Sequence, residues 1–252
     1  MNFNFDKFFP YESIRAEQKR AIEHCLDQYI NQNKRFVVVE AGTGCGKSAI
    51  GLTVGRFMNF HEKKLDENYV DGTYFVTTQK ILQDQYSKDF GKSMCSLKSS
   101  SNYRCSFSKK LNCQESQRAL AANPDKKSAH FKSCTFNCVY KKTKKEFLES
   151  QESVTNFPYF LTEAAYSGKV VPRKFMVVDE AHNIEDELSR FVEVTVSQRF
   201  CESAIKEKWP VRKTQQFVYK WIRDSYFPTV QIKLTHFEQQ LENMGLKSKI
   251  KE

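Results

Sequence analysis

Residues 41–48 read AGTGCGKS and directly follow the apolar, β-branched run FVVVE at residues 36–40. Such a short run predicts a buried strand, and glycines let the following backbone turn tightly around a bound group. The backbone N–H groups of this loop, together with the N-terminus of a helix predicted for residues 48–60, suit a phosphate tail. The candidate nucleotide-binding residues are therefore Ala41, Gly42, Thr43, Gly44, Cys45, Gly46, Lys47 and Ser48.

Two side chains of this loop have expected roles. Lys47 can reach the β- and γ-phosphates of ATP, and the hydroxyl of Ser48 can bind Mg²⁺. Ala41 stands where the usual pattern has glycine, so the loop is a variant form of that pattern.

A second motif, FMVVDEAH, occupies residues 175–182. Asp179 follows four apolar residues and is expected at the end of a strand, where its carboxylate can hold Mg²⁺. Glu180 is then placed to orient and deprotonate a water. An Asp-Glu pair after a strand can also be a simple helix cap, but the loop at 41–48 favours the catalytic interpretation, with Lys47, Asp179 and Glu180 as its residues.

The order of the predicted elements indicates the fold. Helices predicted around residues 11–30, 48–60, 82–86 and 159–161 alternate with strands at 36–39, 74–78, 153–156 and 175–178. This alternation predicts an α/β fold with a parallel sheet flanked by helices. Further on, residues 191–196 could form one more strand, and helices are expected at 217–222 and 230–244.

Composition limits the class of protein. The chain of 252 residues has room for one hydrophobic core plus inserted segments. The sequence contains no run of about 18 apolar residues, so we expect no membrane span. The N-terminus lacks a signal-peptide pattern, so we expect an intracellular protein: cytoplasmic in a bacterium or virus, nuclear in a eukaryote. Residues 91–150 carry thirteen Lys or Arg against four Asp or Glu, within a net charge of +10. Such an excess by itself is more often a solvated loop, but beside the motifs at 41–48 and 175–182 it favours nucleic acid as a partner.

The same basic segment is rich in cysteine but poor in aliphatic residues. Cys105, Cys113, Cys134 and Cys138 are separated by seven, twenty and three residues, and Cys95 is a spare. Four thiolates around a metal could order a segment that has little apolar core. The spacing fits zinc or an iron–sulfur cluster, and free buried thiols are the remaining alternative.

Taken together, these stretches resemble the superfamily 2 helicases, and among them the iron–sulfur DNA helicases of the XPD/DinG type. Further stretches carry the resemblance over residues 8–190: RAEQ at 15–18, TTQ at 77–79, NYRC at 102–105 and VTNF at 154–157. The resemblance implies that Arg15 and Gln18 recognise adenine. It also implies a [4Fe–4S] cluster on Cys105, Cys113, Cys134 and Cys138, with Zn²⁺ as the alternative.

The resemblance implies a domain organisation as well. A P-loop RecA-like domain is expected in two parts, 1–90 and 151–190, interrupted by a cluster insertion at 91–150. Residues 191–252 are expected to start an incomplete, mostly helical arch. The second motor lobe of such helicases has no counterpart in the sequence, so a second polypeptide is an expected partner, beside single-stranded or forked DNA.

Two functions therefore remain open from the sequence. The first is an ATP-dependent DNA helicase, incomplete alone, that couples ATP hydrolysis to movement along single-stranded DNA. The second is a truncated, metal-stabilised nucleic-acid-binding module with little ATPase or unwinding activity.

Overall fold

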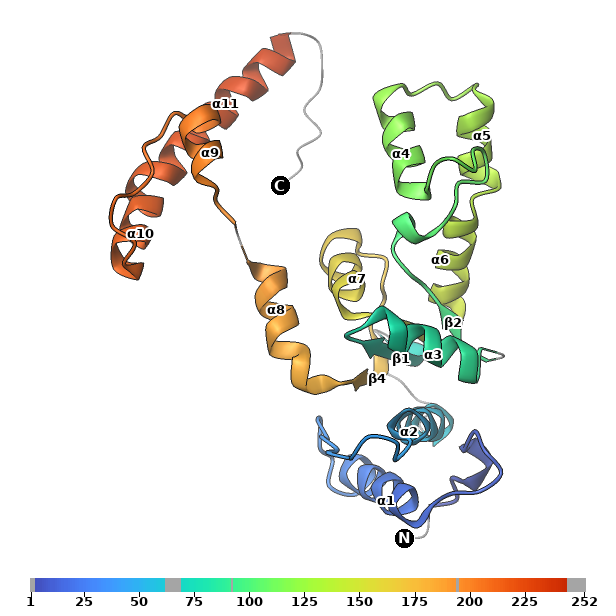
Figure 1. Cartoon of the computed structure of the whole chain (residues 1–252). Helices are drawn as coiled ribbons and strands as arrows, with labels where there is room; N and C mark the ends of the chain where they lie inside the picture. The colour runs from blue at the N-terminus through green and yellow to red at the C-terminus, as the bar shows by residue number, and fades with distance from the viewer. Residues whose placement is uncertain (1–2, 62–68, 92, 194, 244–252) are drawn as a thin grey trace. The chain divides into compact units, whose positions relative to one another are not determined.

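The computed structural model of the chain describes residues 3–61, 69–91, 93–193 and 195–243 (Figure 1). By its internal contacts the chain divides into two compact units, Met1–Phe191 and Val192–Glu252. The first unit contains the whole described sheet. No helix among the described residues has both the length and the apolar character needed to cross a bilayer.

A parallel sheet forms the centre of the first unit. Its strands run in the order β2-β3-β1-β4, and each neighbouring pair is parallel. Parallel neighbours need crossover connections, which helices supply here. The predicted α/β class with a parallel sheet is therefore confirmed. The strands are β1 (Val70–Thr77), β2 (Cys95–Ser96), β3 (Glu152–Asn156) and β4 (Arg173–Asp179).

Helices lie on both sides of this sheet (Figure 1). In the first unit they are α1 (Ala16–Ile30), α2 (Lys47–His61), α3 (Lys80–Phe90), α4 (Cys113–Ala122), α5 (Ala129–Phe136), α6 (Val139–Glu149), α7 (Phe157–Thr162) and α8 (Ile184–Val192). Short helical turns lie at η1 (Asp6–Phe8), η2 (Ser100–Asn102), η3 (Glu163–Ser167) and η4 (Ala181–Asn183). The helices predicted at 48–60 and around 82–86 and 159–161 are present, and the first helix starts at Ala16 rather than near residue 11.

Strand β1 is buried on both faces, because its side chains alternate between two cores. Tyr74 and Val76 pack with Phe147 of α6 and Phe157 of α7. Phe75, on the opposite face, belongs to a core with residues of α2 and α3. A central strand of a parallel sheet has this two-sided burial.

Helix α2 lies unusually close to the sheet. A Cβ atom added at Gly51 would come within 2.7 Å of Cγ1 of Val177 in β4. Any other residue at position 51 would therefore require the Val177 side chain, the helix or the strand to shift. The contact fixes the N-terminus of α2 at the carboxyl end of β4, so the motifs at 41–48 and 175–182 lie next to each other.

The strand predicted at Phe36–Val39 is not formed. Phe36 and Val38 are 79% and 86% exposed, and the described residues show no backbone ladder between this segment and the sheet. A strand requires a hydrogen-bonded neighbour, and among the described residues the edge strand β4 pairs only with β1. The segment is held instead through Val37, which packs against the core around α1 and whose backbone hydrogen-bonds with Tyr29.

The strand suggested for residues 191–196 is also wrong, because α8 continues to Val192; residue 194 lies outside the described residues. The second unit is helical, with α9 (Gln198–Phe200), η5 (Cys201–Ile205), α10 (Gln215–Trp221), η6 (Ile222–Tyr226) and α11 (Phe227–Asn243). The helices expected at 217–222 and 230–244 correspond to α10 and α11. Phe237 on α11 is 58% exposed.

The cysteine-rich segment contributes to the sheet as well as to the surface. Strand β2 pairs with β3, and Leu97 directly after it is fully buried in the core beside Tyr74. Helices α4, α5 and α6 follow. The domain boundaries expected at 90, 150 and 190 stay predictions.

A buried arginine ties the insertion to the sheet. Arg173, at the start of β4, is 8% exposed and donates to the backbone carbonyls of Phe147, Leu148 and Ser150 at 3.3, 3.2 and 2.6 Å. Its guanidinium also lies 4.1 Å from the ring centre of Tyr74. A cation beside the last carbonyls of α6 opposes the negative end of the helix dipole.

Arg173→Ala is expected to lower the free energy of unfolding by about 3 kcal/mol, because it leaves several buried carbonyls without a donor. Urea unfolding of the 252-residue chain measures the effect. Arg190, exposed and paired at 3.4 Å with Glu187, is the matched control, and Arg190→Ala should cost less than about 0.5 kcal/mol. Equal losses in the two variants would contradict this role of Arg173.

Candidate nucleotide site and metal-binding cluster

The two sequence motifs meet at the carboxyl end of β4. Nζ of Lys47 lies 3.5 Å from Oε1 of Glu180, and Oγ of Ser48 lies 3.5 Å from Oδ2 of Asp179. Residues 48 and 179 are 131 positions apart in the chain. The parallel pairing that aligns Thr77 of β1 with Asp179 sets this end of the sheet.

Helix α1 holds the glycine loop from the other side. Gln18, 3% exposed, donates from Nε2 to the carbonyl of Cys45 at 2.9 Å. Arg15 donates to the carbonyl of Gly44 at 3.2 Å, and its own backbone N–H donates to Oε1 of Gln18 at 3.0 Å. The two residues expected to recognise adenine thus contact the loop directly.

Within the loop, the backbone is shaped by two glycines with positive φ. The φ angle is 81° at Gly44 and 83° at Gly46. Residues with a side chain adopt this backbone conformation only with strain. Lys47 donates to the carbonyl of Ala41 at 3.4 Å across the loop, while Gly42 and Thr43 at its tip are exposed.

A buried tyrosine that the sequence analysis missed orients the carboxylate of Asp179. Tyr86 of α3, 2% exposed, donates its hydroxyl to Oδ2 of Asp179 at 3.2 Å. Burial, and next the charge of Asp179, raise the pKa of Tyr86, so the hydroxyl keeps its proton and stays a donor. The backbone N–H of Glu180 donates to the other oxygen, Oδ1, at 3.0 Å. No local pattern around residue 86 points to this contact, since it depends on how α3 packs.

The residue after Asp179 has a strained backbone. Glu180 has φ of 53°, which is uncommon outside glycine and costs about 1–3 kcal/mol. Its side chain lies between Lys47 and His182, whose Nδ1 is 3.3 Å from Oε2 of Glu180. This conformation turns Glu180 toward the glycine loop.

The donor set fits a nucleotide and a hard divalent cation. The hydroxyl of Ser48 and the carboxylate of Asp179 are oxygen ligands of the kind that Mg²⁺ prefers. Lys47 supplies a positive charge at the N-terminus of α2, whose N–H groups favour anions. In the structure Lys47 forms an ion pair with Glu180, so a bound phosphate would replace Glu180 as the partner of this lysine.

The four predicted cluster cysteines lie in two neighbouring pairs. Sγ of Cys113, the first residue of α4, is 3.6 Å from Sγ of Cys138. Cys105 and Cys134 lie on either side of the Ser116 hydroxyl, at 3.2 and 3.3 Å. The spare, Cys95 of β2, is elsewhere and interacts with the carbonyl of Thr143 at 3.9 Å.

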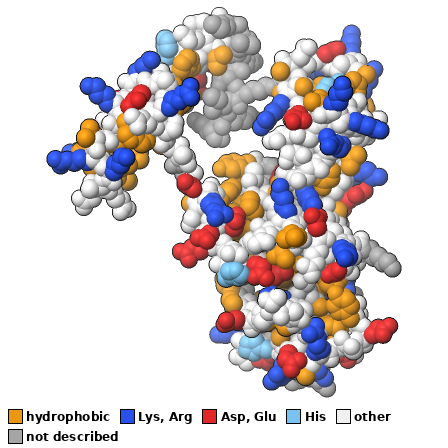
Figure 2. Space-filling model, viewed as in Figure 1, with side chains coloured by type: hydrophobic (Ala, Val, Ile, Leu, Met, Phe, Trp, Pro, Cys, Tyr) orange, Lys and Arg blue, Asp and Glu red, His pale blue; other side chains and the backbone are white. Residues whose placement is uncertain are grey.

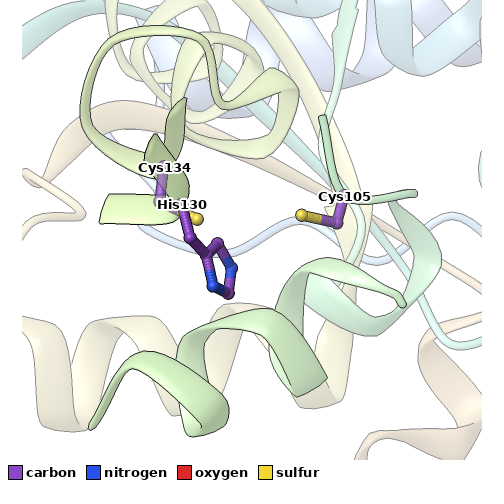
Figure 3. A group of neighbouring side chains, drawn as sticks. All are labelled: Cys105, His130 and Cys134. Atoms are coloured by element: carbon purple, nitrogen blue, oxygen red, sulfur yellow. The ribbon is translucent and has the colours of Figure 1, made fainter. Parts of the chain in front are cut away.

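A histidine that the sequence analysis missed joins the second pair. Ligand atoms of Cys105, His130 and Cys134 all lie within 4.8 Å of one another. Figure 3 shows His130 and Cys134 on one helix, with Cys105 facing them. The sequence signal was present, because His130 and Cys134 are four residues apart and share a helix face.

The surroundings of Cys105 and Cys113 shift the pKa values of the two thiols in opposite directions. Burial by itself raises the pKa of Cys105, but hydrogen bonds from Ser116 and from the backbone of Ser108 and Phe107 outweigh it and lower the pKa overall. Gln117 donates to Sγ of Cys113 at 3.3 Å. Burial and the neighbouring thiol of Cys138 raise the pKa of Cys113 to about 12. Sulfur and imidazole ligands are those that zinc and iron–sulfur centres take.

Basic side chains cover the surface of the same insertion. Figure 2 shows Lys and Arg side chains over the part of the molecule that holds α4 to α6. Among the described residues, several exposed lysines of this segment have no carboxylate within salt-bridge distance. They are Lys109, Lys110, Lys126, Lys127, Lys132 and Lys141.

The fold and the paired motifs define a helicase-like P-loop ATPase domain. Residues 12–235 match the family described as the type III restriction enzyme, res subunit, and the chain belongs to this family, a helicase-like domain of superfamily 2. No curated protein matches the chain. The general activity of this superfamily is ATP-dependent work on nucleic acid.

Gly46→Ala is expected to lower the free energy of unfolding by about 1–3 kcal/mol, because of its positive φ and because the new Cβ would come within 2.4 Å of Nε2 of Gln18. Gly42→Ala is the matched control, since a Cβ there meets nothing within 4 Å, and its cost should stay within about 0.5 kcal/mol. Chemical unfolding without nucleotide measures both. A tolerated Gly46→Ala would show that the loop is not held by α1.

Proposed function

We propose that the chain is the first motor lobe of an ATP-dependent DNA helicase of the XPD/DinG type. The observation that supports it most is the approach of Lys47 and Ser48 to Glu180 and Asp179, each at 3.5 Å. The fold brings side chains that are 131 positions apart in the chain to within 3.5 Å, as a shared triphosphate site requires.

Each residue of this site has a proposed role. Lys47 binds the β- and γ-phosphates, while Ser48 and Asp179 would hold Mg²⁺, which neutralises charge on the phosphates when bound. Glu180 orients the attacking water and accepts its proton. His182 keeps the Glu180 side chain in place through their 3.3 Å contact. Arg15, directly before α1, and Gln18 in its first turn bind adenine.

The insertion is proposed to hold single-stranded or forked DNA. Its exposed lysines can follow a phosphate backbone. The resemblance supports a [4Fe–4S] cluster on Cys105, Cys113, Cys134 and Cys138 as the element that orders the insertion, with Zn²⁺ as the alternative. The pairing of these thiols in the structure agrees with either metal.

A complete motor also needs a second lobe. We propose that a second polypeptide or a further segment supplies arginines that reach the γ-phosphate, a contribution that is worth on the order of 10³-fold or more in related enzymes. The 252 residues are expected to bind ATP and DNA without unwinding duplexes. The alternative is a metal-stabilised nucleic-acid-binding module. It predicts that the chain binds ATP but that DNA does not stimulate ATP hydrolysis.

ATP binding and DNA-stimulated hydrolysis test the proposed site. Lys47→Ala should weaken ATP binding, whereas Glu180→Gln should keep binding and lower the hydrolysis rate by at least about 10²-fold, since it loses the general base. Titration with ATP and single-turnover hydrolysis measure the two steps, with and without a candidate second lobe.

Glu185→Gln, an exposed carboxylate on α8, is the control and should behave like the unaltered chain. Unchanged ATP affinity in Lys47→Ala would overturn the proposed site. Efficient unwinding by the 252 residues would contradict the need for a second lobe.

DNA binding should weaken as salt rises, because it releases counterions. Replacing Lys126 and Lys127 together by alanine is expected to reduce the slope of log affinity against log salt by roughly 1.4, at about 0.7 per lost phosphate contact on a single strand. Fluorescence anisotropy with a labelled oligonucleotide measures it. Lys19 and Lys34, which are exposed outside the insertion, form the charge-matched control pair, and an equal effect there would place the DNA elsewhere.

A further inference from the structure

We propose that His130 is a direct ligand of the metal centre in the insertion, together with Cys105 and Cys134. The inference rests on the proposed metal-stabilised insertion and changes its ligand set from four cysteines to a mixed cysteine–histidine set. The ligand class is a soft or borderline metal centre: either a single Zn²⁺ bound by two thiolates and one imidazole, or a cluster in which these side chains bind different iron atoms.

The spacing of the donor atoms supports this assignment. A single tetrahedral metal binds sulfur at about 2.3 Å and imidazole nitrogen at about 2.0 Å, so its ligands must lie within a few ångströms of one another. The atoms of Cys105, His130 and Cys134 all lie within 4.8 Å of one another. The four predicted cysteines instead separate into one thiol pair and a second pair that shares Ser116.

The imidazole is held in place from two directions. Its ring stacks on the ring of Phe107 at a centroid distance of 4.6 Å and an angle of 14°. Its Nε2 lies 2.6 Å from Oγ of Ser116, a fully buried residue that also contacts both sulfurs. A metal ligand is commonly fixed in this way by packing and by an outer hydrogen bond.

Local structure brings the three ligands together. His130 and Cys134 lie one turn apart on α5, which Ser128 caps by accepting from the backbone N–H of Phe131 at 3.1 Å. Cys105 enters from the other side, on a loop pinned by its backbone N–H, which donates to the carbonyl of Leu111 at 3.0 Å. Cys113 and Cys138, whose sulfurs lie 3.6 Å from one another, are the candidates for the remaining ligand.

Two substitutions at His130 separate ligation from packing. His130→Phe keeps a ring for stacking on Phe107 but offers no ligand atom, whereas His130→Cys offers a thiolate but no ring. Ligation predicts that His130→Phe binds metal at least about tenfold more weakly, because the loss of an outer-sphere partner alone costs about that much. It predicts that His130→Cys keeps the metal.

The experiment uses the 252-residue chain, purified without oxygen. Zinc, iron and acid-labile sulfide per chain are measured directly, and Co²⁺ is titrated into metal-free protein. In His130→Cys the sulfur-to-cobalt charge-transfer absorption should be stronger than in the unaltered chain, because an additional sulfur has replaced nitrogen. Iron with sulfide identifies a cluster, and zinc alone identifies a single ion.

Ser116→Ala is the control for an indirect role, since it removes the hydrogen bond and leaves all three ligands. It should lose less metal affinity than His130→Phe. Full metal content in His130→Phe, or an equal loss in Ser116→Ala, would overturn the assignment of His130. ATP binding, measured in the same variants, separates this failure from a failure of the proposed motor lobe, because the nucleotide site does not include the insertion.

Discussion

The candidate nucleotide site depends on the close packing of α2 against β4. Gly51 allows the helix to contact Val177 directly, and the parallel pairing of β1 with β4 fixes where the strand ends. Lys47 at the start of the helix and Asp179 at the end of the strand are therefore placed by backbone geometry. For the proposed site this means that both side chains start from positions set by the fold, which is the kind of preorganisation that a phosphate site requires.

Much of this arrangement could be predicted from the sequence. The alternation of elements predicted the parallel sheet, and the motifs at 41–48 and 175–182 predicted which ends would meet. Whether residues 36–39 form a strand could not be predicted from the segment itself. Its β-branched residues favour extended backbone, but a strand also requires a hydrogen-bonded neighbour, and pairing is a property of the fold rather than of the segment.

The contacts missed in the sequence share a physical cause. Tyr86 reaches Asp179 because α3 packs over β1, and nothing within α3 distinguishes this tyrosine from a core residue. His130 was different, since its spacing from Cys134 on one helix was visible. Imidazole and thiolate are both common ligands of zinc, so this spacing could have indicated a mixed ligand set. The spacing along α5 could have indicated His130, whereas only the tertiary packing of α3 brings Tyr86 to Asp179.

The outer edge of β4 has a consequence for the behaviour of the protein in solution. The described residues leave this edge without a paired strand, and exposed Phe36 and Val38 extend the apolar surface of the first unit. Open strand edges are the places where proteins associate edge to edge and aggregate, and charged side chains on such strands oppose it. Lys174 stands at an exposed position of β4, and a charged side chain on an edge strand opposes pairing with a second copy.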